Sequence, residues 1–275
     1  MTASNRVHVF IPCLIDRFRP QAGAAVFRIL QRLGMEPVYA ERPSCCGQPF
    51  YKSGRWRQAL PLAKTTISAF RDADMVVIPS GSCGTMIRHH YKVLFRHDPF
   101  WFEQAAALSR KVYEFSEFLI HVAGVDDLEA SYPGRVTYHD SCQVLRGLGI
   151  REEPRSLLRK VRELDFVEME DSDVCCGFGG VFSLKSPHVS RAMAEHKIAR
   201  VAETGASAVV GCEISCLMHM EAHLERLGLP IRTFHLAEIL DPLCSSPGGD
   251  KIRALRSPQA RQAQRNPTSF SRQGP

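Results

Sequence analysis

The chain has 275 residues, 44% of them hydrophobic, which suffices for one large domain or two domains of ordinary size. Its formal net charge of +6 comes from residues 251–275, which hold six basic residues and no acidic one, so the rest carries 29 charges of each sign. A neutral body excludes a basic surface for nucleic acid. No stretch approaches the 18 or so apolar residues of a membrane helix, and the polar start at Met1 does not resemble a signal peptide.

Whether the ten cysteines indicate disulfides or metal binding depends on the cellular compartment of the protein. Without a membrane span or a signal peptide we expect a cytoplasmic protein, where thiols stay reduced. Cysteines in such a protein indicate metal binding or redox chemistry in preference to disulfides.

The first half alternates between strand and helix. Short apolar runs predict strands at 7–11, 37–39 and 75–78, and helical spacing predicts helices at 20–33 and 54–70. Residues 84–124 are predicted to be helical and to connect the two halves. The polar stretch 126–134 is the expected boundary, which makes 1–125 the first domain.

The second half, 126–244, repeats this order. The expected strands are 135–139, 166–168, 208–210 and 231–234, and the expected helices lie at 153–164, from Ser186 past Val201, up to Leu227, and through Leu240. Both halves are therefore predicted to be Rossmann-like α/β layers with parallel sheets flanked by helices, related by pseudo-symmetry. Residues 245–275 are rich in Ser, Pro, Gly, Gln and Arg, which predicts a disordered basic tail.

The Cys-Cys-Gly triplet occurs once in each half, and the cysteines around it keep the same order. Between Cys13 and Cys45 there are 31 residues, and between Cys142 and Cys175 there are 32. The candidate ligands all follow the carboxyl ends of predicted strands: Cys13, Cys45, Cys46 and Cys83, and then Cys142, Cys175, Cys176, Cys212 and Cys216. In parallel α/β sheets sites form at that edge. We therefore expect one site in each half.

Four thiolates from three loops can hold zinc or an iron–sulfur cluster. Neither half has the C-x2-C knuckle common in structural zinc sites, and adjacent cysteines suit a cluster because each sulfur can bind a different iron. The pattern favours iron–sulfur clusters, with zinc and free redox thiols as alternatives. Cys244 lies outside both repeats and is interpreted as an incidental thiol.

Four stretches in order carry a resemblance to a known family: Cys45-Cys46-Gly47-Gln48-Pro49, Ser80-Gly81-Ser82-Cys83, Cys175-Cys176-Gly177-Phe178-Gly179-Gly180 and Ser215-Cys216-Leu217-Met218. With Cys13 and Cys142 they resemble the duplicated cysteine-rich (CCG) domain. That domain is shared by the cysteine-rich subunit of heterodisulfide reductase, the iron–sulfur subunit of glycolate oxidase and lactate utilization proteins. The likeness spans about residues 6 to 242.

The resemblance implies an iron–sulfur subunit, of the [4Fe–4S] kind, in a system that oxidises L-lactate or a related 2-hydroxy acid. It also implies two partners, an iron–sulfur protein and a third small protein. In the reductase relative each full motif ends in C-x-x-C, and five cysteines hold a non-cubane cluster. Here Met86 stands three residues after Cys83, and the second half has Cys212 and Cys216 in a C-x3-C arrangement.

The sequence offers no clear flavin site and no obvious general base, so catalysis by this chain alone is left open. Two alternatives stay beside the oxidoreductase subunit: a non-catalytic electron-transfer or scaffold subunit, and a thiol–disulfide oxidoreductase like the reductase relative. The glycine run 177–180 lacks the third glycine of a dinucleotide loop, since Phe182 stands there.

The histidines have structural interpretations as well as functional ones. His139, three residues before Cys142, is either a hydrogen-bonded residue at a strand end or a group that tunes a cluster. His219 and His223 have a zinc-binding spacing but no evident third ligand, so a solvated helix face is the better interpretation, and the same holds for His89-His90.

Overall fold

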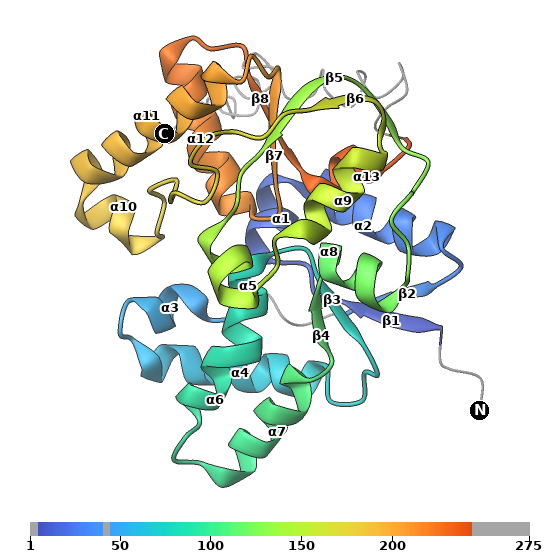
Figure 1. Cartoon of the computed structure of the whole chain (residues 1–275). Coiled ribbons are helices and arrows are strands. Elements are labelled where there is room, and N and C mark those ends of the chain that lie inside the picture. The colour runs from blue at the N-terminus through green and yellow to red at the C-terminus, as the bar shows by residue number, and fades with distance from the viewer. Residues whose placement is uncertain (1–4, 41–44, 244–275) are drawn as a thin grey trace, which may run out of the picture.

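The computed structural model describes residues 5–40 and 45–243; Cys244 and the predicted tail at 245–275 lie outside them. Figure 1 shows two α/β units, one built from the N-terminal half of the chain and one from the C-terminal half. Each contains a four-stranded parallel sheet with helices against it. The predicted fold class is thereby confirmed.

The first sheet has the order β2-β1-β3-β4, and all its strands are parallel. Its strands are β1 (Arg6–Val9), β2 (Glu36–Tyr39), β3 (Val76–Ile78) and β4 (Val112–Glu114). Its helical segments are α1 (Cys13–Phe18), α2 (Pro20–Arg32), α3 (Gln48–Lys52), α4 (Trp56–Ala69), α5 (Gly81–Thr85), η1 (Met86–His90), α6 (Tyr91–Leu94), α7 (Pro99–Ser109), α8 (Phe115–Glu117) and η2 (Phe118–Val122). The central strand β3 is wholly buried and apolar, as a parallel strand covered on both faces should be.

The second sheet repeats that topology with the order β6-β5-β7-β8. Its strands are β5 (Ser131–Tyr138), β6 (Arg162–Phe166), β7 (Ala208–Gly211) and β8 (Arg232–His235). Its helical segments are η3 (Gln143–Leu148), α9 (Glu152–Lys160), α10 (Val181–Lys185), α11 (Pro187–Glu203), α12 (Ile214–Leu227) and α13 (Leu236–Leu240). The repeat thus extends to the order of strands in space.

Two predicted elements were placed wrongly. The region 84–124 is not wholly helical, because it contains β4, the fourth strand of the first sheet. A three-residue strand between helices is too short to show an alternating pattern. The second strand of the second half was expected at 166–168 and lies at Arg162–Phe166, directly after α9. β6 is an edge strand with charged residues, which obscure an apolar run.

Both halves close their fourth strand with the same helix cap. Glu114 accepts the backbone N–H of Ser116 while the Glu117 carboxylate accepts the N–H of Glu114. At the equivalent place, His235 accepts the N–H of Ala237, and a carboxylate three residues on accepts the N–H of His235. Such capping boxes satisfy amide groups that a helix start leaves free. The duplication therefore includes β4 and β8 with their caps.

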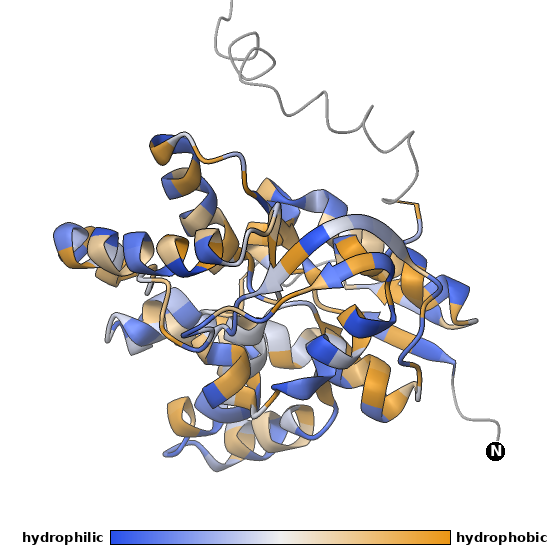
Figure 2. Cartoon of the chain, turned by 45° about the horizontal axis from the view of Figure 1, so that its top comes forward, coloured by the Kyte–Doolittle hydropathy of each residue, from blue (hydrophilic) through white to orange (hydrophobic). Residues whose placement is uncertain are grey.

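The two halves share a hydrophobic core. One cluster of buried side chains draws Val26, Val77 and Phe118 from the first half and Tyr138 and Leu236 from the second. In Figure 2 the peripheral helices alternate between hydrophilic and hydrophobic residues along their length, as expected when one face packs inward. Removing either half would expose this core, so we expect the halves to be stable only together.

No helix within residues 5–40 and 45–243 combines the length and the apolar character needed to cross a lipid bilayer.

Candidate metal centres

The structure brings four cysteines of the first half together at the carboxyl edge of their sheet. Cys13 begins α1 directly after β1, Cys45 and Cys46 precede α3, and Cys83 lies in α5 after β3. Their thiols lie next to one another in the order Cys13, Cys45, Cys46 and Cys83. We call this set the first thiol group.

The second half holds an equivalent set, which we call the second thiol group. Cys142 precedes η3, Cys175 and Cys176 follow β6, and Cys216 lies in the first turn of α12. The thiols of this group lie next to one another in the order Cys142, Cys175, Cys176 and Cys216. In each group the two later sulfurs are buried and the two earlier ones are half-buried, so one side of each group faces the surface.

The glycine of each Cys-Cys-Gly triplet is required by its backbone. Gly47 has φ +84° and Gly177 has φ +88°, in the left-handed region that favours glycine. This turn aims the Gly47 N–H at the Cys45 sulfur and the Gly177 N–H at the Cys175 sulfur, each at 3.4 Å. A Cβ on Gly177 would lie 2.5 Å from the Ser190 carbonyl oxygen. The glycine therefore allows both a close approach to α11 and a donor directed at sulfur.

Burial and the neighbouring thiols disfavour the presence of several thiolates in one group at the same time. The hydrogen bond to Cys45, followed by burial, raises the pKa of the Cys13 thiol. Bonds from Cys13 and Cys46 lower the pKa of Cys45. In the second group, the bond to Cys175 and burial raise the pKa of Cys142. All four thiols of a group become thiolates only when a cation replaces their protons.

The helices that carry Cys83 and Cys216 are linked at their N-terminal ends across the junction between the halves. Ser80 and Glu213, the N-cap residues of α5 and α12, occupy equivalent positions and bond to each other, with the Ser80 hydroxyl donating to the Glu213 carboxylate at 3.0 Å. That carboxylate also accepts the Ser82 N–H at 2.7 Å. Beside them α5 packs so closely on η3 that a Cβ on Gly81 would collide with Val144. Figure 1 shows α5 beside the segment that follows β5.

A family model described as a cysteine-rich domain, CCG, matches residues 7–88 and 136–221, which contain both thiol groups. The chain belongs to the CCG cysteine-rich domain family. It is 44% identical over 236 residues to lactate utilization protein A of Geobacillus thermodenitrificans, covering 86% of this chain and 98% of that protein. It is 41% identical over 236 residues to lactate utilization protein A of Bacillus subtilis, covering 86% and 99%.

Among solved structures, a hypothetical protein from Helicobacter pylori superposes with a TM-score of 0.63 at 11% identity. The match covers 90% of this chain and 50% of that one. At such low identity the likeness is one of fold alone.

The donor set of this CCG protein is compatible with metal or with iron–sulfur clusters. Four thiols from three loops supply the number of sulfurs that a cluster needs, and backbone N–H groups directed at sulfur stabilise its negative charge. Every cysteine of the described ranges is a free thiol, including the adjacent cysteines of each triplet.

Cys212 lies apart from the second thiol group. Its side chain is fully buried in the core that the two halves share, whereas Cys176 and Cys216 belong to another cluster. The Tyr138 hydroxyl donates to the Cys212 sulfur at 3.4 Å. Burial, followed by the nearby Glu114, raises the pKa of the Cys212 thiol. In the repeat its counterpart is Pro79, which is no ligand. The structure gives Cys212 a packing role, and ligation by Cys212 stays a prediction.

His139, in contrast, lies within the second thiol group. One of its ring nitrogens and the sulfurs of Cys176 and Cys216 all lie within 4.8 Å of one another, the one such group of metal-ligating atoms in the described ranges. Burial, and after it the charge of Lys197, lowers the pKa of His139 to about 3, so the imidazole is neutral. Neither nitrogen makes a hydrogen bond of normal geometry, although the Ser172 backbone is near enough to affect the pKa.

The other histidines make different contacts. The His219 ring meets Phe178 edge-on, with centroids 5.8 Å apart, and its Nε2 lies 3.4 Å from the Ser190 hydroxyl. His223 lies against His219, and His90 stacks on Tyr51. These contacts are those of packed or partly solvated side chains, and the group of metal-ligating atoms does not include them.

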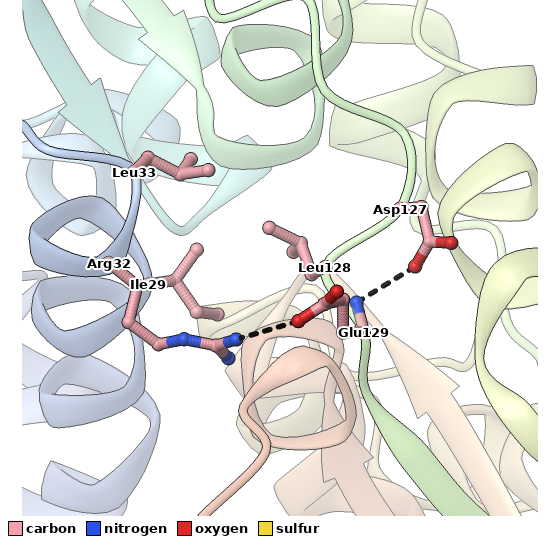
Figure 3. Close-up of a pocket in the computed structure, with 6 residues that line it drawn as sticks. All are labelled: Ile29, Arg32, Leu33, Asp127, Leu128 and Glu129. Atoms are coloured by element: carbon pink, nitrogen blue, oxygen red, sulfur yellow. Dashed lines mark hydrogen bonds and ion pairs between the residues drawn. The ribbon is translucent and has the colours of Figure 1, made fainter.

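A surface pocket lies away from both thiol groups, between α2 and the connection that leads into β5 (Figure 3). It is lined by Ile29, Arg32, Leu33, Asp127, Leu128 and Glu129. Arg32 and Glu129 form an exposed ion pair at 3.7 Å, and Asp127 accepts the Glu129 N–H at 2.8 Å. No cysteine contributes to this pocket, so it is not a candidate for the redox site.

The residue that sequence reasoning missed is Lys197 of α11. Its side chain is fully buried, and its ammonium donates to the carbonyl oxygens of Asp171 and Ser172 in the loop before Cys175. A comparison of equivalent positions in the two halves would have found it, because the first half has an uncharged Thr66 there.

Proposed function

We propose that this chain is the iron–sulfur subunit of an L-lactate-oxidising system, which passes electrons from lactate to an acceptor with partner subunits. The observation that supports this most is that each half brings four cysteine thiols next to one another, within a chain that is 41–44% identical to proteins named for lactate utilization. An iron–sulfur protein and a third small protein are the proposed partners.

Bound clusters would supply the chemistry of single-electron acceptance and release. The chain's own residues hold them: Cys13, Cys45, Cys46 and Cys83 in the first group, and Cys142, Cys175, Cys176 and Cys216 in the second. Oxidation of lactate to pyruvate releases two electrons, so two one-electron centres match the reaction. The half-buried sulfurs of Cys45 and Cys175 would face the surface from which a partner approaches.

A second candidate is an electron-relay subunit that does not itself act on lactate. It is favoured by the contact between α5, which carries Cys83, and η3, which follows Cys142, because this contact joins the elements that hold the two thiol groups. A thiol–disulfide oxidoreductase is the third candidate, since each group has half-buried sulfurs.

Anaerobic reconstitution with iron and sulfide, followed by lactate, distinguishes the three. Bleaching of the cluster absorbance by lactate without partners supports direct oxidation, and bleaching only when the partners are added supports the relay. Reduction of a heterodisulfide by the chain in the absence of lactate supports the third. Zinc without acid-labile sulfide in the anaerobically purified protein contradicts the first two.

A further inference from the structure

The two thiol groups differ at one position that the repeat makes strictly comparable. Phe10 and His139 each stand three residues before the first cysteine of their group. Their backbones make the same bond, since Phe10 donates its N–H to the Val77 carbonyl at 3.0 Å and His139 to the equivalent Val210 carbonyl at 2.8 Å. The first group thus has a phenyl ring where the second has an imidazole.

The two rings differ in whether they carry buried polar atoms without a hydrogen-bond partner. Phe10 is fully buried and packs with Cys46, Cys83 and Met86, so its site is satisfied by apolar contact. His139 is 1% exposed, and neither ring nitrogen has a hydrogen bond of normal geometry. Buried polar atoms in folded proteins almost always have a partner. The sulfurs of Cys176 and Cys216 are the groups that its nitrogen approaches, within 4.8 Å.

A second difference is a buried lysine beside the second group, where the first half has a threonine. Gly47 faces Ala59 and Gly177 faces Ser190, which makes Thr66 the counterpart of Lys197. The Thr66 hydroxyl donates within its own helix, to the Leu62 carbonyl at 3.0 Å. Lys197 is fully buried, and it lies close enough to Cys176 for a thiolate there to interact with its ammonium. A buried ammonium there favours a more negative, reduced centre.

We propose that His139 is a nitrogen ligand of the second metal centre, and that the second centre, which has the ammonium of Lys197 beside it, has the higher reduction potential of the two. The inference rests on the proposed function, because it needs a cluster in each half. A neutral imidazole adds no negative charge to the four thiolates, and the buried ammonium of Lys197 then favours the reduced form of the second centre. Electrons entering the protein then collect at the second centre.

This ligand gives the second half a fifth donor, which the first half lacks. Cys212 bonds to Tyr138 in the shared core, which leaves four cysteines in the second group. His139 supplies the fifth donor from the end of β5, before the first cysteine of the group. The Ser172 backbone lies close to the imidazole, and a ligating histidine is normally oriented by a partner of this kind.

The test uses the full chain, purified anaerobically with its clusters, as wild type and as H139F, H139C and H219F. Pulsed EPR of the reduced protein, with 14N and 15N histidine, is expected to show a directly bound nitrogen in wild type and in H219F. The coupling is absent from H139F and H139C. H139C offers sulfur in place of nitrogen, so it keeps the cluster if H139F proves unstable.

The redox titration gives the second readout. At a fixed poise, the ratio of reduced to oxidised second centre should fall at least tenfold in H139C, a shift of 59 mV for one electron, while the first centre is unchanged. A wild-type protein with full iron and sulfide but without bound nitrogen, or with coupling retained in H139C, overturns this inference alone. A protein that binds no iron and no sulfide overturns the proposed function itself.

Discussion

Gly177→Ala tests whether the Cys-Cys-Gly triplet depends on its backbone geometry and on its close approach to α11. An alanine at φ +88° costs about 1–2 kcal/mol from the backbone alone. Its Cβ would also lie 2.5 Å from the Ser190 carbonyl oxygen and 2.9 Å from the Met193 Cβ, so α11 must move. Overpacking of this kind costs about 1–3 kcal/mol more. We expect a total loss of about 2–5 kcal/mol.

Two other glycines separate the backbone effect from the packing effect. Gly228 has φ +66° and nothing within 4 Å of an added Cβ, so Gly228→Ala should cost only the backbone term of about 1–2 kcal/mol. Gly47→Ala adds a contact of 3.3 Å with the Ala59 carbonyl oxygen and should lie between the two.

Anaerobic urea denaturation of the three variants, with iron counted in the folded fraction, measures this order. The loss of stability should rise from Gly228→Ala through Gly47→Ala to Gly177→Ala. The two triplet variants should also lose iron, and Gly228→Ala should lose none. Equal stability of Gly177→Ala and Gly228→Ala would refute the close approach to α11.

Three further predictions concern buried groups. Cys175→Ser should lose about half of the bound iron and Cys212→Ser almost none, as metal analysis would show; equal loss would contradict the packing role of Cys212. Burial raises the pKa of Glu114 to about 7 from 4.5, so the fold loses stability between about pH 4.5 and 7 as the carboxyl ionises. Glu114→Gln should remove most of that decline, about 3 kcal/mol, in denaturation curves at pH 5 and 8; an unchanged pH dependence would assign the decline to another group. Arg19 is buried and bonds to Glu221 at 2.6 Å, so Arg19→Met should cost about 2–3 kcal/mol in thermal unfolding, and a loss below about 1 kcal/mol would count against this link between the halves.

The repeat could be predicted because short local sequence patterns mark its strands, its helix starts and its cysteine motifs. Apolar runs such as Val76–Ile78 mark buried strands, Pro20 marks the start of α2, and the paired Cys-Cys-Gly triplets fix the equivalence of the halves. Since parallel strands end at one edge of a sheet, the convergence of the cysteines could be expected from the sequence alone.

What the sequence concealed depends on contacts between distant residues. The bond from Ser80 to Glu213 joins residues 133 positions apart, and nothing local marks either as a partner. The packing of Cys212 against Tyr138 is likewise tertiary, and so is the burial of Lys197 beside the second thiol group. β4 was missed because three residues carry too little pattern.

The role of His139 was left open by its position in the sequence, because a histidine at a strand end is compatible with either interpretation. Its burial, its unpaired nitrogens and its place beside Cys176 and Cys216 are what distinguish the two. Only the folded chain supplies all three observations.

The central claim is that each half of this chain holds an iron–sulfur cluster on its four converging cysteines. The most direct measurement is the content of iron and acid-labile sulfide in the anaerobically purified chain, with Mössbauer spectra to count the clusters. We predict iron and sulfide in equal amounts, in two cluster populations, one of them lost in Cys175→Ser. A chain that holds zinc without sulfide, or a single cluster that survives Cys175→Ser unchanged, would contradict this claim.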